Sequence, residues 1–419
     1  MQVASQHGIF ASYDDIWLLD AIRTPFADYN GALGVNSPTD MGIAVAKTLL
    51  ARQPGIKPSV GHVFAGNMAQ ASFDAYMLPR HITLYAGLPL HVPSTLTQRI
   101  CGTGIELLMQ AADQVSLGRM NAGLCVGTES MSRNPMVAYT HRTGFKLGKV
   151  EFGDFLWEAL TDPAIGCSMG QTAETLARQY RISRDEADQF AVRSFERALS
   201  AREAGHLKNE VISLQTVRFD MPGYQPRELS IRHHDATPLM HDSHPRPTTK
   251  STLTALPAVF GGVQTAGNSA AIVDGASAAL IGNRKTLLEC NTQPLAKIRA
   301  ISVVGVPPEI MGMGPAAAIR LLIEKTGLSL QEIGCFEINE AFAAQCLAVM
   351  RELSLDEGIV NLSGGAIAIG HPLAATGLRQ VQTLARQMVR DHLQYGIASA
   401  CIGGGQGIAI LLEHPNNRK

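Results

Sequence analysis

Glycine-dense segments frame three reactive side chains and limit what the chain can fold into. Cys101 begins the segment CGTG, His371 lies in GGAIAIGHPLAATG, and Cys401 begins CIGGGQG. Glycine adopts positive φ angles and leaves room for a neighbouring backbone or a ligand, so we expect tight turns where elements approach closely. Cysteine and histidine act as nucleophiles, acids or bases near neutral pH. The three segments together therefore predict a catalytic site.

Strand-like and helix-like patterns alternate around these segments. The apolar run DIWLLDAIRTP is typical of a buried strand, and an amphipathic helix pattern follows it, with Thr39 or Asp40 as the expected N-cap. A second helix, expected from about Gly104 to Ser116, leads to the strand-like LCVGTES. Strands that alternate with helices usually form parallel pairs joined by crossover helices, so we predict an α/β fold.

The C-terminal part of the chain repeats features of the N-terminal part. Thr376 and Gly377 begin a helix pattern that leads to a glycine-ended strand, as Thr103 and Gly104 do. The segment PLAKIRAISVVG also resembles the opening strand. Such an internal repeat predicts two similar α/β halves. We expect the first half at 12–130, completed by about 267–291, and the second half at 292–419.

The stretch 131–266 differs in composition from both halves. It contains charged helix patterns, in which Ser183 and Glu186 have the spacing of a capping box, and a segment rich in proline and histidine. We expect an inserted loop domain that lies over the core. The histidine-rich segment suggests either a zinc site or a solvated loop. The segment has no cysteine partners, so we predict no metal site there. The role of its four histidines stays open: His233, His234, His241 and His244.

Composition excludes several classes of function. The 419 residues carry a formal net charge of −1, so no basic excess indicates a nucleic-acid-binding face. The 7 cysteines are unevenly spaced and lack CxxC pairs, which is typical of reduced thiols rather than of a disulfide framework. No long apolar run predicts a membrane span, and the first residues lack a secretory pattern, so we expect a cytoplasmic location.

The position of each cysteine indicates whether its thiol is reactive. Cys101 shortly precedes a predicted helix, and the partial positive charge of a helix N-terminus favours a thiolate. Cys401 ends a predicted strand before a run of glycines, in a turn whose backbone N–H groups suit an oxyanion. The ordinary alternative is a buried thiol that packs as a small hydrophobe. We assign this structural role to four cysteines: Cys125, Cys290, Cys335 and Cys346. The role of Cys167 stays open.

Further motifs accompany the glycine-framed segments in a fixed order: TAGNSAAIVDGA at 265–276, MGMGP at 311–315, NEAFA at 339–343, GGAIAIGHPLAATG at 364–377 and CIGGGQG at 401–407. Together with QRICGTG around Cys101, they resemble the motifs of the thiolases, that is, the acetyl-CoA acetyltransferases and 3-ketoacyl-CoA thiolases. The resemblance covers essentially the whole chain. It implies a five-layered αβαβα fold with two similar halves and an inserted loop domain.

The resemblance implies a role for each reactive group. Cys101 would accept the acyl group, His371 would take its proton, and Cys401 would act as acid and base at the α-carbon of acetyl-CoA. Asn339 would position a water that forms one oxyanion hole with His371. The backbone N–H groups of Cys101 and Gly403 would form the other oxyanion hole.

Substrate-binding positions and partners follow from the same resemblance. Ser269 matches the position that meets the pantetheine arm of coenzyme A (CoA), Met169 a position that lines the acyl pocket, and Phe342 a further substrate-binding position. No permanently bound cofactor is implied, because CoA and acyl-CoA are substrates. We expect a homo-oligomer, either a dimer or a tetramer, with no nucleic-acid partner.

The implied reaction is the reversible CoA-dependent cleavage of a 3-ketoacyl-CoA, or the Claisen condensation of acetyl-CoA with an acyl-CoA. A second titratable group must serve the α-carbon while Cys101 is acylated, and ping-pong kinetics should follow. A decarboxylating ketoacyl-synthase-like enzyme and a non-catalytic acyl-CoA- or lipid-binding relative are the alternatives. Cys167 and Ser168 stand where many thiolases have a histidine, so the length and branching of the acyl chain stay open. Whether the reaction runs toward cleavage or condensation in the cell also stays open.

Overall fold

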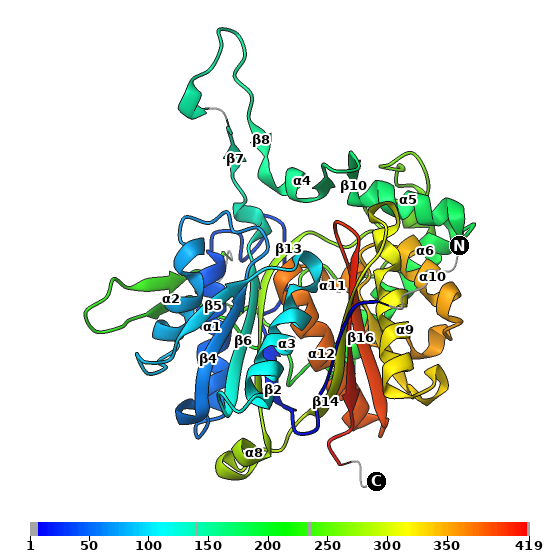
Figure 1. Cartoon of the computed structure of the whole chain (residues 1–419). Helices are drawn as coiled ribbons and strands as arrows, with labels where there is room; N and C mark the ends of the chain where they lie inside the picture. Colours follow the sequence, from blue (N-terminus) through cyan, green and yellow to red (C-terminus); the bar gives the residue numbers. More distant parts are fainter. Residues whose placement is uncertain (1–6, 140, 233–236, 417–419) are drawn as a thin grey trace.

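The computed structural model describes residues 7–139, 141–232 and 237–416. Two α/β halves contain its large sheet, and an inserted stretch packs against them (Figure 1). The first half contains β2 (Trp17–Arg23), β3 (Ala27–Asp28), α1 (Pro38–Arg52), β4 (Val60–Gly66), α2 (Leu78–Tyr85), β5 (Ser94–Thr97), α3 (Thr103–Ser116), β6 (Ala122–Glu129), β13 (Val273–Gly282) and α8 (Arg284–Cys290). The second half contains β14 (Ala296–Gly305), α9 (Gly314–Thr326), β15 (Cys335–Ile338), α10 (Ala343–Leu353), α11 (Ala366–Ile369), α12 (Leu373–Arg390), β16 (Tyr395–Ile402) and β17 (Gln406–Glu413).

The two halves have the same strand order. The first half-sheet runs β4-β6-β13-β2 and the second β15-β16-β17-β14, while β5 extends the first beyond β4. In each half the first two strands of this order are parallel and the third is antiparallel to the second. The N-terminal strand β1 (Ile9–Ser12) pairs with β14 of the other half. The predicted α/β fold with two similar halves is therefore confirmed.

Helices cover and separate the half-sheets in five layers (Figure 1). α3 and α12 lie between the half-sheets, α1 and α2 cover the outer face of the first, and α9 and α10 cover the outer face of the second. Buried apolar clusters fill the spaces between these layers, represented by Leu49, Ile105 and Leu322. The expected layered arrangement is confirmed. The short pairing of β2 with β14 also makes the half-sheets continuous along one edge.

Two glycines allow α3 and α12 to touch at their N-terminal ends. A Cβ atom on Gly104 would lie 2.6 Å from the backbone nitrogen of Leu378, and one on Gly377 would lie 2.6 Å from the nitrogen of Ile105. No side chain fits at that distance, so only glycine permits this contact. The segments that precede the two helices, which carry Cys101 and His371, are thereby brought together.

Side-chain caps fix the helix starts, and one of them differs from the prediction. The N-cap of α1 is Ser37, whose hydroxyl accepts a hydrogen bond from the Asp40 nitrogen at 3.2 Å. The expected caps Thr39 and Asp40 lie in the first turn instead, because Pro38 occupies the first helical position that proline favours. The capping box predicted for Ser183 and Glu186 is confirmed at the start of α6 (Arg184–Glu203).

The inserted stretch forms an arm followed by helices and short strands that pack against both halves (Figure 1). The arm leaves through β7 (Met136–Val137), returns through β8 (Gly153–Asp154) and projects away from both halves. None of the helices in the described ranges is long and apolar enough to cross a membrane. Beyond the arm the elements are α4 (Phe155–Ala159), β9 (Thr161–Asp162), β10 (Cys167–Ser168), α5 (Met169–Gln179), α6, β11 (Val217–Phe219), β12 (Arg227–Leu229) and α7 (Lys250–Thr254).

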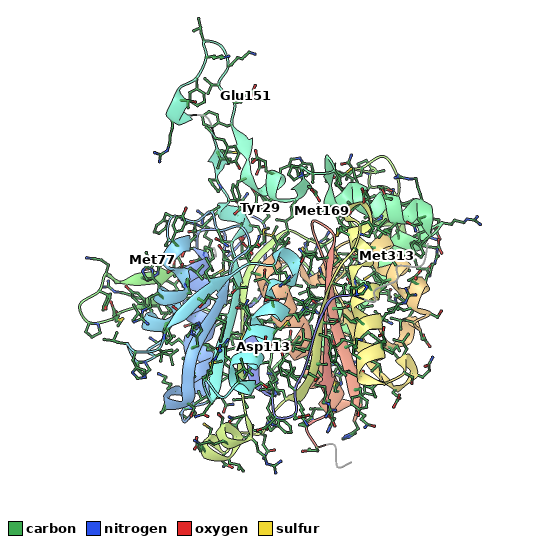
Figure 2. All side chains as sticks on the ribbon, in the orientation of Figure 1. Tyr29, Met77, Asp113, Glu151, Met169 and Met313 are labelled. Carbon is green, nitrogen blue, oxygen red and sulfur yellow. The ribbon has the colours of Figure 1, made fainter. Side chains whose placement is uncertain are left out.

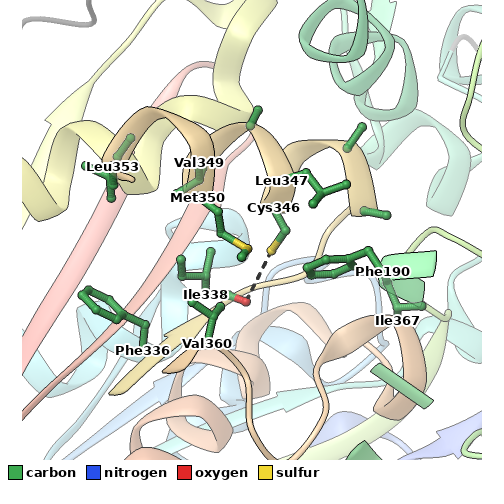
Figure 3. Packing of buried hydrophobic residues seen from close by; sticks show 14 of the residues in the cluster. Phe190, Phe336, Ile338, Cys346, Leu347, Val349, Met350, Leu353, Val360 and Ile367 are labelled. Atoms are coloured by element: carbon green, nitrogen blue, oxygen red, sulfur yellow. Dashed lines mark hydrogen bonds between the residues drawn. The ribbon is translucent and has the colours of Figure 1, made fainter. Parts of the chain in front are cut away.

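The inserted helix α6 contributes to the core of the second half. Figure 3 shows Phe190 of α6 near Leu347 and Cys346 of α10. The Cys346 thiol donates to the carbonyl oxygen of Ile338 at 3.8 Å, as Figure 3 also shows. Of the thiols expected to be structural, Cys125, Cys335 and Cys346 are buried, whereas Cys290 is only half-buried at the end of α8.

Candidate active site

A cavity of about 500 Å³ opens between the two halves and the inserted stretch. Cys101, His371 and Cys401 all line it, although they are far apart in the sequence. Tyr29 and Met169, which also line it, lie on the side of the core that faces the arm (Figure 2). The other wall residues are mostly apolar and include Met131, Trp157, Leu160, Phe260, Met311 and Leu373.

The backbone around Cys101 is tightly constrained. Ile100 has a φ of 44°, in the left-handed region that β-branched residues rarely adopt. A Cβ atom on Gly102 would lie 2.6 Å from a side-chain carbon of Ile402, so this turn packs directly against the end of β16. Such packing holds the unfavourable backbone angle in place and fixes the position of the Cys101 sulfur at the start of α3.

The Cys101 thiol is protonated in the resting site. Burial raises the pKa of Cys101 to about 12, although the backbone N–H groups of Gly403 and of Cys101 itself bind the sulfur and oppose this shift. The expected stabilisation of a thiolate by the helix N-terminus is therefore outweighed by desolvation. The sulfur consequently needs a base before it can attack a carbonyl carbon.

His371 has the form that a base requires. Burial, helped by the charge of Arg379, lowers the pKa of His371 to about 3, so the imidazole is neutral. Its Nδ1 lies 2.6 Å from the Thr376 hydroxyl, and its Nε2 lies 3.3 Å from Nδ2 of Asn339. An amide nitrogen can only donate, so Nε2 is the unprotonated nitrogen in this arrangement and Nδ1 carries the proton.

Cys401 ends β16 and lies among apolar side chains. It packs with Met311, Ala341 and the half-buried Met169 and Phe342. Burial raises the pKa of the Cys401 thiol above its ordinary value, and the nearby Cys101 adds to this effect. Both thiols are therefore neutral at rest, and a thiol of this kind donates a proton to a carbanion or enolate.

Asn339 follows β15 and is fully buried next to His371. Its backbone nitrogen donates to the carbonyl oxygen of Ser399 at 2.9 Å, which ties it to β16. Its side-chain Oδ1 is buried and has no hydrogen-bond partner within the described residues. A buried amide oxygen without a partner is a suitable acceptor for an ordered water molecule, as the sequence-based role of Asn339 requires.

The predicted substrate-binding residues line the same cavity. Ser269 donates its hydroxyl hydrogen to the Thr265 carbonyl at 2.7 Å and forms a β-bridge with Phe342. Met169 is the first residue of α5, and its sulfur lies 3.3 Å from where a Cβ on Gly403 would be. These positions place all three residues on the cavity wall, and their contacts with substrate stay predictions.

Sequence reasoning missed Glu129, the last residue of β6. Its buried carboxylate accepts hydrogen bonds from the backbone nitrogens of Met68 at 3.0 Å, Ala69 at 3.1 Å and Ala374 at 3.2 Å. Burial raises the pKa of Glu129 to about 7. The carboxyl group therefore ties a first-half loop to the start of α12, just after His371. The sequence signal that could have indicated Glu129 is an acidic residue at the end of a largely apolar strand.

The histidine-rich segment contributes one residue to the cavity wall. His244 lines the cavity and lies 2.6 Å from a carboxylate oxygen of Asp28, whereas His241 lines a separate pocket. Within the described ranges, histidine, cysteine and acidic side chains form no group suited to a metal ion. His233 and His234 lie outside the described residues.

Comparison with known proteins places the whole chain in one family. Residues 16–285 match the family described as "Thiolase, N-terminal domain", and residues 292–414 match "Thiolase, C-terminal domain". The mitochondrial 3-ketoacyl-CoA thiolase of Bos taurus is 40% identical over 403 residues, which cover 95% of this chain and 98% of that protein. A beta-ketoadipyl-CoA thiolase of Acinetobacter baylyi is 36% identical over 411 residues, covering 95% and 98%.

Solved structures give the same result. The crystal structure of human mitochondrial 3-ketoacyl-CoA thiolase in complex with CoA superposes with a TM-score of 0.89 at 37% identity, covering 96% of this chain and 98% of that one. The acetyl-CoA acetyltransferase of Bacillus anthracis gives a TM-score of 0.87 at 36% identity, covering 96% and 99%. The chain therefore belongs to the thiolase family of acyltransferases.

Proposed function

We propose that this thiolase-type acyltransferase, which acts on 3-ketoacyl-CoA and acetyl-CoA, uses Cys101, His371 and Cys401 for two successive half-reactions. One observation carries the proposal. The neutral thiols and the neutral imidazole, from opposite halves of the chain, line a single cavity. Such a set can generate a nucleophile and can also supply a proton to a second centre.

In the first half-reaction, Nε2 of His371 takes the proton of Cys101. The thiolate attacks the 3-keto carbon of the substrate, and the backbone N–H groups of Cys101 and Gly403, which face the sulfur, stabilise the oxyanion that forms. Cleavage of the bond between C2 and C3 leaves an acyl group on Cys101 and an enolate of acetyl-CoA. Asn339, through a water molecule, and His371 stabilise the enolate oxygen while the Cys401 thiol protonates its carbon.

In the second half-reaction, the thiol of CoA attacks the acyl-enzyme. The Cys401 thiolate left by the first half-reaction takes the proton of the CoA thiol. When the shortened acyl-CoA leaves, the Cys101 sulfur takes back its proton from the His371 imidazolium, which restores all three groups. Cys101 is acylated when the enolate must be protonated, so one cysteine cannot perform both tasks. For CoA itself we propose that the pantetheine arm lies against Ser269, on the cavity wall next to Phe342.

Steady-state thiolysis tests this function. The protein should cleave 3-ketohexanoyl-CoA when CoA is added, and double-reciprocal plots at several CoA concentrations should be parallel, because the first product leaves before CoA reacts. Absence of cleavage would refute the proposal and favour a non-catalytic acyl-CoA-binding relative. Release of CO₂ from malonyl-CoA with no thiolysis would instead favour the decarboxylating alternative.

We further propose that the protein assembles as a dimer or tetramer and that the arm contacts another copy. Large apolar side chains on the arm are exposed: Met136, Tyr139, Leu147, Val150 and Phe152. An exposed set of this kind is typical of an interaction surface. Sedimentation velocity at micromolar concentration should show a species larger than the 44.8 kDa chain.

Substitution on the arm separates its role from other contacts between copies. Leu147→Asp should reduce the sedimentation coefficient, because it places a charge in an apolar interface. Lys146→Glu alters the charge at the neighbouring exposed position and is the matched control. This variant should have the sedimentation coefficient of the wild type. A wild-type chain that sediments as a monomer would contradict the proposal, and an unchanged Leu147→Asp oligomer would exclude the arm as the contact.

A further inference from the structure

Part of the cavity wall lies beside Cys101 and is apolar. Cys101 packs at the edge of a cluster built from both the first half and the inserted stretch. Its buried members are Met68, Ala69, Met131, Leu156 and Leu373, and Leu160 packs against them. Of these residues, Met131, Leu160 and Leu373 also line the cavity, so an acyl group that extends from the Cys101 sulfur contacts these three side chains. We call them the acyl wall.

The cavity offers no free positive charge to a substrate. Besides Cys101, His371 and Cys401, the described residues that line the cavity include three ionisable side chains: Asp28, Tyr29 and His244. Asp28 and His244 pair with each other at 2.6 Å. Within the part of the chain that the structure describes, no lysine or arginine lines the cavity. A carboxylate on the acyl group would therefore meet no partner of opposite charge at this wall.

A buried carboxyl group lies directly behind the acyl wall. Glu129 accepts hydrogen bonds from the backbone nitrogens of Met68 and Ala69, which pack in the same apolar cluster as the wall residues but do not line the cavity. When ionised, this group repels a second carboxylate nearby, and when protonated it offers no compensating charge. Transfer of an unpaired carboxylate into such surroundings is strongly unfavourable.

We propose that this protein transfers acyl groups with an uncharged hydrocarbon tail and discriminates against acyl groups that end in a carboxylate. The inference rests on the proposed function and specifies its substrate class. Overall similarity does not decide the matter, because proteins named for 3-ketoacyl-CoA and for beta-ketoadipyl-CoA resemble the chain to a similar degree. The inference is carried by the apolar residues beside Cys101 and by a lining that, among the described residues, contains no lysine or arginine.

Two substrates of equal length test the inference. 3-Ketohexanoyl-CoA and 3-ketoadipyl-CoA have the same six-carbon acyl chain and differ only at its end, a methyl group in one and a carboxylate in the other. We expect kcat/KM for thiolysis to favour 3-ketohexanoyl-CoA by a factor on the order of 100, as an unpaired buried charge requires. Comparable values for the two substrates would overturn this inference alone. Failure to cleave either substrate would overturn the proposed function and the inference with it.

A charge introduced into the wall provides the second test. Leu160→Arg should bring a cation to the cavity and narrow the ratio of kcat/KM values at least about tenfold. Leu160→Gln, which is polar but neutral, is the matched control and should not narrow the ratio in this way. Trp157→Arg makes the same change at a more exposed lining residue, 56% exposed, and serves if Leu160→Arg does not fold. A ratio unaffected by a folded arginine variant would contradict the assignment of this wall to the acyl chain.

Discussion

Cys101→Ser is expected to abolish formation of the acyl-enzyme. A serine hydroxyl at this position is far less acidic than a thiol, and the neutral His371 cannot activate it as effectively. We expect the thiolysis rate to fall by a factor on the order of 10⁴ to 10⁶, as for the loss of a nucleophile in other covalent enzymes. Intact-mass spectrometry after addition of acetyl-CoA should show one acetyl group on the wild-type chain and none on the variant.

Other thiols provide the control for this experiment. Cys167 and Cys290 are also half-buried, so Cys167→Ser and Cys290→Ser test whether exposure alone accounts for acylation. Both control variants should accept the acetyl group as the wild type does. An adduct retained on Cys101→Ser and mapped by peptide analysis to another cysteine would refute the role of Cys101.

Cys401→Ala is expected to separate acylation from chemistry at the α-carbon. Cys101 and His371 remain intact, so the variant should still form the acetyl-enzyme. It lacks the thiol that donates to and accepts from the α-carbon, and we expect its thiolysis rate to fall by about 10²- to 10⁴-fold. The α-protons of acetyl-CoA should exchange with D₂O in the presence of the wild-type protein but not of the variant, as measured by NMR.

The two readouts together assign the role of Cys401. Loss of both acylation and exchange would mean that the substitution disturbs the Cys101 site, which lies close to Cys401. Exchange at the wild-type rate in Cys401→Ala would exclude this thiol as the acid and base. Cys335→Ala removes another buried thiol of the second half, one in β15 that does not line the cavity, and should leave the exchange unchanged.

The sequence allowed prediction of an α/β fold with two similar halves and of the segments that meet at the cavity, because local signals carry both. The layered arrangement followed from the family resemblance instead. Glycines mark positions where backbones touch, and the contact between Gly104 and Gly377 is an example. Capping residues mark helix starts, although Pro38 moved the cap of α1 to Ser37. Such signals lie within a few residues of the feature that they predict.

Contacts between distant residues could not be predicted in this way. Glu129 binds the Ala374 nitrogen, 245 positions along the chain, and no local pattern indicates that pairing. The pKa of Cys101 depends on burial by the whole fold, so the helix N-terminus alone gave the wrong direction for the shift. His244 came from a segment that composition assigned to a solvated loop or a metal site, yet it pairs with Asp28 of the first half.

The position of β13 determines the order in which the chain can fold during synthesis. β13 lies between β2 and β6 in the first half-sheet, yet the ribosome makes it only after the whole stretch 131–266. Until β13 emerges, β2 and β6 each have an unpaired edge. The partner of β1 is β14, which is made after β13. Unpaired edges of this kind promote aggregation, and pairing between distant segments is slow. We therefore expect the nascent protein to expose these strand edges until β13 has been made, a stage at which aggregation competes with folding.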